Sequence, residues 1–127
     1  ETGEERSKGL TREVINGQID SLFTALGEST SKVNLEFLIA YEPVWAIGTG
    51  ESASPDLASE THIMIRDRVA QHNAVVAETI KILYGGSVNE KNAGSFFEKG
   101  EIGGALIGGA SLKPHSFNEI RKLAAGA

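Results

Sequence analysis

One carboxylate occupies a position suited to acid–base chemistry. Glu42 comes just after a short, mostly apolar run, residues 35–40, and is followed by Pro43. The run is too short for a helix and suits a strand buried on both faces of a parallel sheet. A carboxylate at the mouth of such a sheet, among apolar neighbours, can have a raised pKa and act as a general base. An ordinary solvated acid at a strand end is the alternative, and position alone does not exclude it.

Two glycine-rich turns follow the other predicted strands. Residues 85–87 (Gly-Gly-Ser) and 108–111 (Gly-Gly-Ala-Ser) each lie between a strand and a helix. Glycine lets the backbone approach a ligand closely, and backbone amides at a helix start favour phosphate. One such turn is weak evidence, because glycine is common in tight connections. Two on successive strands favour a phosphate site about as much as they favour packing.

A third glycine-rich stretch, residues 48–53 (Gly-Thr-Gly-Glu-Ser-Ala), matches the dinucleotide fingerprint Gly-x-Gly-x-x-Ala. That fingerprint begins right at a strand end and is followed by an acid at the tip of the next strand. Here residues 42–47 intervene, and the position about 20 residues further on falls inside a predicted helix. The sequence therefore argues against a dinucleotide site. The segment between Pro43 and Ser54 is better interpreted as a mobile lid that pivots at Gly48 and Gly50.

The three histidines are interpreted as structural. His62 and His72 lie on a predicted helix, His115 follows the last glycine turn, and none of them ends a strand. No His-Glu-x-x-His or similar ligand set is present, so neither a metal site nor a cofactor is predicted. The absence of cysteine rules out a thiol nucleophile and a disulfide framework.

Alternating helices and strands must position these residues. Helices are predicted over residues 11–26, 54–71, 90–98 and from 114 onward, and strands over 35–40, 80–84 and 105–107, with a loop at 28–34. Thr11 is the expected N-cap of the first helix and Gly27 its stop, while Ser54 and Pro55 open the second. Strands that alternate with helices imply right-handed crossovers and a parallel sheet. The turns after the strands therefore lie side by side at its C-terminal edge.

Composition narrows the class of protein. The chain has 127 residues and a net charge of −5, which speaks against a nucleic-acid partner. No apolar run approaches the roughly 18 residues of a membrane span, so no membrane association is predicted. The opening residues do not resemble a signal peptide, and a cytoplasmic location is the default expectation.

Four segments resemble the triosephosphate isomerase family. Residues 40–50, Ala-Tyr-Glu-Pro-Val-Trp-Ala-Ile-Gly-Thr-Gly, are similar to the family's sixth strand, catalytic base and flexible lid. Residues 82–88 and 105–112 resemble its seventh and eighth strands with their loops, and residues 1–6 resemble the stretch after the fifth strand. The resemblance implies an α/β fold of the (β/α)8 TIM-barrel class, here a C-terminal partial barrel. Three parallel strands and their helices would form a single domain over residues 1–127.

The resemblance also implies roles for particular residues. Glu42 would be the base that interconverts dihydroxyacetone phosphate and glyceraldehyde 3-phosphate through an enediolate, in glycolysis and gluconeogenesis. The backbone amides of four residues would hold the substrate phosphate: Gly48, Ser87, Gly108 and Gly109. Tyr84 and Ser87 would hydrogen-bond the closed lid. The lid itself would include Pro43, Val44, Trp45, Ala46, Ile47 and Thr49.

The chain also departs from the family pattern. The family's catalytic lysine, its catalytic histidine and the serine near that histidine have no counterpart, and neither do the first five strands. Gly103 stands where the family usually has an Asp that pairs with the arginine matching Arg66, so Arg66 is expected to lack that partner. We expect the chain alone to be inactive, and to associate with itself or to need the missing strands, whereas the full-length family is homodimeric. The alternative is a non-catalytic phosphate-binding half-barrel that pairs with another chain.

Overall fold

The computed structural model describes residues 1–27 and 37–126. The predicted loop at 28–34 and the start of the predicted strand at 35–40 lie outside the described residues. In chain order the elements are α1 (Gly3–Ser7), α2 (Thr11–Leu26), β1 (Leu38–Tyr41), the 3-10 turn η1 (Val44–Ala46), α4 (Pro55–His72), α5 (Ala74–Thr79), β2 (Lys81–Tyr84), α6 (Ala93–Phe97), the 3-10 turn η2 (Gly109–Leu112) and α7 (Pro114–Ala125). The described part of the chain is thus an α/β structure, as predicted.

The sheet has two parallel strands among the described residues, not the three that the sequence predicts. β1 and β2 pair in register from Leu38 with Lys81 to Tyr41 with Tyr84. The expected third strand makes only an isolated parallel bridge, between Ala105 and Tyr84. The reason lies just before that bridge, where Gly104 has a φ of 150°. This backbone conformation, which side chains other than glycine's rarely adopt, interrupts a regular ladder.

The segment after α6 nevertheless runs along β2. The amide of Gly103 donates to the carbonyl of Ile82 at 2.8 Å, and the amide of Tyr84 donates to the carbonyl of Gly104 at 3.0 Å. The amide of Leu106 then donates to the carbonyl of Tyr84 at 2.9 Å. The turn that follows, at residues 108–111, is therefore held beside the turn that follows β2.

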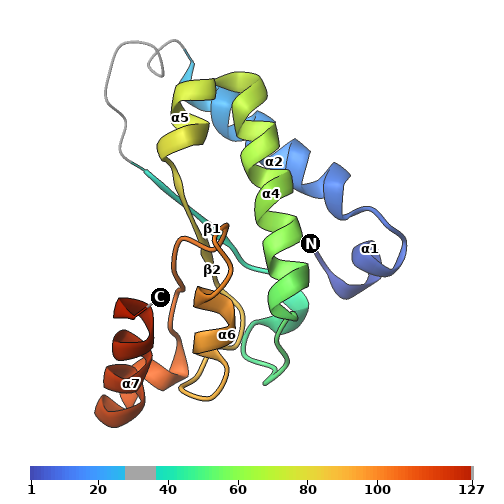
Figure 1. Ribbon diagram of the computed structural model, residues 1–127. Coiled ribbons are helices and arrows are strands. Elements are labelled where there is room, and N and C mark those ends of the chain that lie inside the picture. The colour runs from blue at the N-terminus through green and yellow to red at the C-terminus, as the bar shows by residue number, and fades with distance from the viewer. Residues whose placement is uncertain (28–36, 127) are drawn as a thin grey trace.

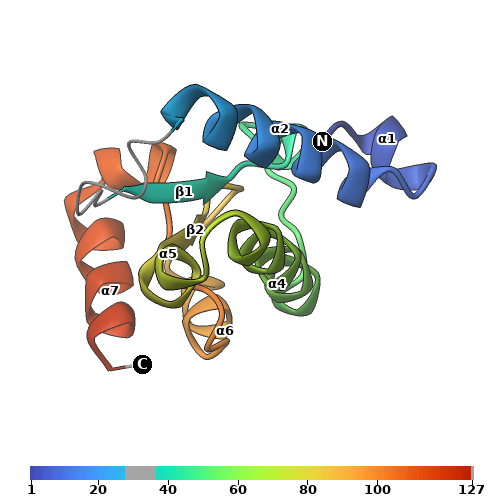
Figure 2. The ribbon, with the colours of Figure 1, turned by 90° about the horizontal axis from the view of Figure 1, so that it is seen from above.

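The helices pack on one another as well as on the sheet. α2 lies along α4, α5 folds back on α4, and α6 packs on α7 (Figure 1). Seen from above, α4, α5 and α6 lie on the same side of the two strands (Figure 2). The core between these elements is apolar, with Ile15 and Phe23 of α2, Val69 of α4, Ile82 of β2 and Phe96 of α6 all buried.

The other face of the sheet is open in the described part of the chain. The apolar sequence of the first strand suits burial on both faces, but in the described part of the chain one face is uncovered. Leu38 is 62 % exposed and Ala40 is also exposed, whereas Tyr41 is buried. Leu106, beside β2, is exposed as well. No described element covers these side chains, so only one face of β1 has the environment that its apolar sequence suits.

Local signals explain most helix ends. Gly27, at φ 55°, ends α2, and Ser54 Oγ accepts a hydrogen bond from the amide of Leu57 at 3.2 Å to open α4; both were predicted. Thr11 is not a cap, because Leu10 holds that position without a side-chain hydrogen bond. α4 ends at Asn73, whose Oδ1 caps the unpredicted helix α5.

A charged cluster fastens α2 to α4. The carboxylate of Asp20 accepts two hydrogen bonds from Arg68, at 2.7 and 2.6 Å, and lies 2.7 Å from Nε2 of His72. The guanidinium first, and the imidazole second, lower the pKa of Asp20 to about 2. The His72 ring also stacks on Phe23 at 4.7 Å between centroids. His72 thus belongs to helix packing, which agrees with its structural interpretation.

Candidate active site at the C-terminal edge of the sheet

Glu42 stands at the end of β1, beside the turn that follows β2. The amide of Gly85 donates to the carbonyl of Tyr41 at 2.8 Å, so the parallel pairing extends one step beyond the strands and sets Gly85 next to Glu42. The Glu42 side chain is exposed and lines a cavity of about 690 Å³. This is the arrangement expected when the ends of parallel strands meet at one edge.

The cavity brings together the residues for which the sequence predicted chemistry. Glu42 shares its wall with the predicted lid residue Ile47 and with the four predicted phosphate-binding residues, Gly48, Ser87, Gly108 and Gly109. Beside Gly108 and Gly109 an added Cβ would meet no atom within 4 Å, so their backbones border open space. The roles of these residues remain predictions, because a shared cavity does not by itself test them.

The predicted lid residues form the turn η1 and the loop after it. Pro43 and Ala46 are buried, Trp45 is half-buried, and Val44 is exposed; none of the four lines the cavity. Thr49 Oγ1 donates to the carbonyl of Trp45 at 3.0 Å. The segment therefore has internal hydrogen bonds and a buried anchor, while its tip faces the cavity.

Gly48 and Gly50 have φ values of 68° and 81°. Side chains other than glycine's rarely adopt this left-handed conformation. The two predicted pivots of the lid are thus the two points at which this segment needs glycine.

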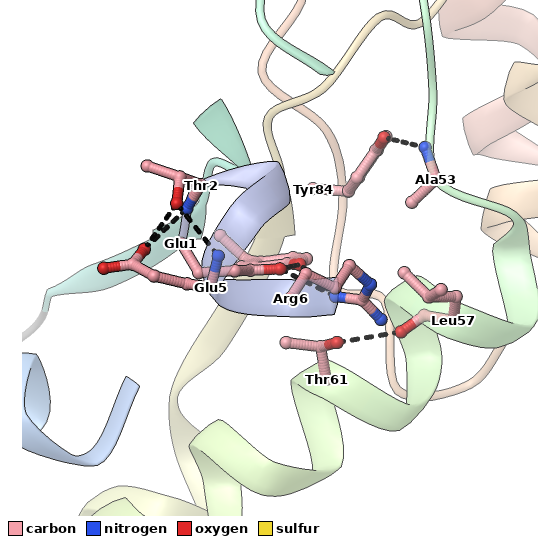
Figure 3. Close-up of polar contacts among 9 residues, drawn as sticks. Glu1, Thr2, Glu5, Arg6, Ala53, Leu57, Thr61 and Tyr84 are labelled. Carbon is pink, nitrogen blue, oxygen red and sulfur yellow. Dashed lines mark hydrogen bonds and ion pairs between the residues drawn. The ribbon is translucent and has the colours of Figure 1, made fainter. Parts of the chain in front are cut away.

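Two side chains from the end of β2 hold this segment. The hydroxyl of Ser87 donates to the carbonyl of Ala46 at 3.1 Å. The hydroxyl of Tyr84 accepts a hydrogen bond from the amide of Ala53 at 2.7 Å (Figure 3). The Tyr84 ring is fully buried and stacks on Phe96 at 4.4 Å between centroids. Burial raises the pKa of Tyr84, against the smaller effect of the Ala53 amide.

A buried carboxylate supports the base of the lid from the opposite side. Glu1 Oε1 accepts a hydrogen bond from Nη1 of Arg6 at 2.7 Å (Figure 3). It accepts another from the hydroxyl of Tyr41 at 2.9 Å. The carbonyl of Glu1 also accepts from the amide of Val44 at 3.0 Å. Burial, and then the Glu1 carboxylate, raise the pKa of Tyr41. The residues on either side of Glu42 and Pro43 are therefore fixed by the N-terminal segment.

Comparison with known proteins bears on this arrangement. The family model described as triosephosphate isomerase matches residues 1–124. The chain belongs to the triosephosphate isomerase family. It is 50 % identical over 127 residues to the triosephosphate isomerase of Proteus mirabilis, covering 100 % of this chain and 48 % of that protein. For the triosephosphate isomerase of Pseudoalteromonas translucida the identity is 48 % over 126 residues, covering 99 % of this chain and 49 % of that protein.

A third relative, the triosephosphate isomerase of Erwinia tasmaniensis, is 50 % identical over 127 residues, which is 100 % of this chain and 49 % of that protein. The chain therefore spans about half the length of the triosephosphate isomerases that it matches. None of the helices described is long and apolar enough to cross a membrane.

Arg66 was expected to lack the Asp partner usual in the triosephosphate isomerase family, because Gly103 stands at that position. The structure shows which groups it binds in this chain. Its Nε instead donates to Oε2 of Glu101 at 3.3 Å, and its Nη1 donates to the carbonyls of Ala77 at 2.5 Å and Ile80 at 3.2 Å. A carboxylate two residues earlier thus takes the place of the missing one.

His62 packs beside this arginine and not in the cavity. It is fully buried, and its Nδ1 lies 3.2 Å from the carbonyl of Glu101. Burial lowers its pKa to about 4. Among the described residues, no group of three or more histidines and acids is placed to hold a metal ion. None of the three histidines, His62, His72 and His115, lines the cavity that holds Glu42.

Sequence reasoning missed three charged residues of the cavity wall: Glu90, Lys91 and Lys113. The pKa of Glu90 is lowered, first by its own backbone amide, then by the hydroxyl of Ser116 and by the two lysine cations. The sequence did contain a signal for the position of Lys113, because this residue directly precedes the proline that opens α7. Nothing in the local sequence pointed to Glu90, whose place depends on α7 folding back beside it.

Proposed function

We propose that this chain supplies the C-terminal half of a triosephosphate isomerase, with Glu42 as its general base. The observation that carries the proposal is the single cavity that Glu42 shares with Gly48, Ser87, Gly108 and Gly109. A proton-abstracting carboxylate and a set of backbone amides at glycine turns are what a small phosphorylated ketose or aldose requires. Membership of the family supports the same reading.

In the proposed reaction, Glu42 removes a proton from the carbon beside the carbonyl of dihydroxyacetone phosphate. The electron pair of the broken C–H bond forms an enediolate. A proton then passes from the hydroxyl oxygen to the former carbonyl oxygen, and Glu42 returns its proton to the neighbouring carbon to give glyceraldehyde 3-phosphate. The amides of Gly48, Ser87, Gly108 and Gly109 hold the phosphate meanwhile. An enediolate exposed to water can lose phosphate, so a closed lid protects the product.

The proposal requires groups beyond this chain. Negative charge develops on the enediolate oxygen, and a preorganised donor for such a charge typically contributes about 10²–10³ in turnover. The resemblance assigns that role to a lysine and a histidine without counterparts here. We therefore propose that the chain is inactive alone and works only with the remaining strands, whose packing would cover Leu38 and Leu106. A cytoplasmic location stays a prediction.

A chimera tests the function directly. The part of the Proteus mirabilis relative that this chain does not match is joined to the N-terminus of this chain, giving a full-length protein. Turnover of dihydroxyacetone phosphate is then measured for the chimera and for the chain alone. The proposal expects isomerase turnover from the chimera and none from the chain. A folded chimera without turnover, or a chain active by itself, would contradict it.

The open face of the sheet favours a second candidate, a phosphate-binding half-barrel that pairs with another chain and has no catalysis. Leu38 and Leu106 are exposed there, while the glycine turns and two lysines line the cavity. This candidate predicts binding of inorganic phosphate by the isolated chain together with a folded but inactive chimera. The same pair of measurements therefore separates the two candidates.

A further inference from the structure

Gly85 lies unusually close to Glu42. A Cβ built on Gly85 would stand 2.5 Å from Cγ of Glu42 and 3.2 Å from both its Cδ and its Oε1. Real Cβ atoms essentially never approach another atom within 3.0 Å. The two residues are neighbours at successive strand ends, where the amide of Gly85 donates to the carbonyl of Tyr41. In-register neighbours on adjacent strands project their side chains to the same face.

We propose that Gly85 is a positioning residue for Glu42. The space left by the missing Cβ is the space through which the glutamate side chain passes, so Gly85 sets how far the carboxylate reaches into the cavity. This inference rests on the proposed role of Glu42 as the base. It assigns to Gly85 a role different from phosphate binding, which was the first interpretation of this glycine turn.

Other reasons for a glycine at this position do not hold. Gly85 is not among the glycines with positive φ, so its backbone conformation is open to other residues. Its amide already donates to the carbonyl of Tyr41, so it is not available to a phosphate oxygen. The three nearest atoms to the added Cβ all belong to Glu42, so general packing does not account for it either.

The next residue provides a matched contrast. A Cβ on Gly86 would stand 2.1 Å from the hydroxyl oxygen of Tyr84 and 2.4 Å from its Cζ. The Tyr84 side chain is fully buried, its ring stacks on Phe96 and its hydroxyl accepts a hydrogen bond from the amide of Ala53, so no space is left into which it could shift. The Glu42 side chain, by contrast, is exposed. An alanine at 86 must therefore cost stability, whereas an alanine at 85 displaces the carboxylate.

The expected loss follows from the size of the displacement. Restoring an ordinary contact of at least 3.4 Å requires Cγ of Glu42 to move by about 1 Å. A misplacement of about 1 Å in a catalytic group can cost about 10²-fold in rate. The amides proposed to hold the substrate phosphate belong to other residues, so phosphate binding should not change. Gly85→Ala should thus lower kcat about 10²-fold and leave KM unchanged.

A double-mutant cycle in the full-length chimera tests whether Gly85 acts through Glu42. The variants are Gly85→Ala, Glu42→Gln, the two combined, and Gly86→Ala for comparison. For each we measure kcat, KM, the inhibition constant of inorganic phosphate, and Tm. In the Glu42→Gln background, Gly85→Ala should cause no further loss, because the group that it displaces no longer acts as a base. Its Tm should stay near that of the parent, well above that of Gly86→Ala.

Three results would overturn the inference. The first is an equal loss from Gly85→Ala in both backgrounds, and the second is a rise in KM or weaker inhibition by phosphate in place of a fall in kcat. The third is a loss of Tm, or of folding, as large as that of Gly86→Ala. A Glu42→Gln variant that keeps its turnover would instead overturn the proposed function, so the two failures are distinguishable.

Discussion

Tyr84→Phe isolates the hydrogen bond that holds the C-terminal end of the lid. The hydroxyl of Tyr84 accepts from the amide of Ala53 at 2.7 Å, and Ala53 is 2 % exposed. Phenylalanine keeps the ring and its stacking on Phe96, so no large cavity forms. The buried amide is left without its acceptor, which costs about 1–3 kcal/mol of the free energy of unfolding.

The assay is urea unfolding of the full-length chimera, followed by circular dichroism, with and without Tyr84→Phe. Ser21→Ala is the matched control, because it also removes a hydroxyl that makes a hydrogen bond, to the carbonyl of Gly17, but at an exposed site. The control should change the free energy of unfolding by no more than about 0.5 kcal/mol. If Tyr84→Phe costs no more than this control, the hydroxyl does not fasten the lid and the reasoning is refuted.

Two further predictions concern the buried groups behind the site. Burial lowers the pKa of His62 to about 4, below the unfolded value of about 6.5, so the unfolded chain binds more protons between these values. The contribution of His62 to the free energy of unfolding should therefore be complete above about pH 6.5 and fall by about 3 kcal/mol as the pH drops to about 4. Urea unfolding at several pH values measures this slope, which should be absent in His62→Gln. An equal slope in the parent and in His62→Gln would refute the reasoning. Arg66→Met should cost about 1–3 kcal/mol because the carbonyls of Ala77 and Ile80 lose their donor, whereas Glu101→Gln should cost less than about 1 kcal/mol because that pair is partly exposed. Equal losses from the two variants in the same unfolding assay would show that the ion pair, and not the carbonyl contacts, stabilises this corner.

Short-range signals in the sequence predicted the helix ends that depend on one residue's chemistry. Gly27, Ser54 and Pro55 are such cases. The same rules were available but unused for α1, where Thr2 Oγ1 accepts from the amide of Glu5 and the Glu5 carboxylate accepts from the amide of Thr2 (Figure 3). The start of α1 was therefore missed although the sequence contains the signal for it.

Features that depend on distant parts of the chain were not predictable in this way. A continuous apolar run cannot tell whether one or both faces of a strand will be covered, and the exposure of Leu38 shows the difference. The prediction of a third strand was wrong because of the backbone conformation of Gly104, which the pattern of apolar residues in the sequence does not indicate. The contacts of Glu1 with Tyr41 cross 40 positions of the chain, and only the fold brings them together.

The candidate site was more predictable than the fold around it. Glu42, the turn after β2 and the turn before α7 meet because the ends of parallel strands lie at one edge, which follows from topology alone. The steric fit of Gly85 against Glu42 required coordinates, because it depends on the direction of a single side chain.

The measurement that tests the central claim most directly is kcat for Glu42→Gln in the full-length chimera. Glu98→Gln is the matched control, since Glu98 is an exposed glutamate at the end of α6 and lies away from the cavity. A positioned general base contributes about 10²–10⁴-fold, so Glu42→Gln should lose at least about 10²-fold while Glu98→Gln keeps the parent rate. If Glu42→Gln turns over dihydroxyacetone phosphate as fast as Glu98→Gln, then Glu42 is not the base and the account is wrong.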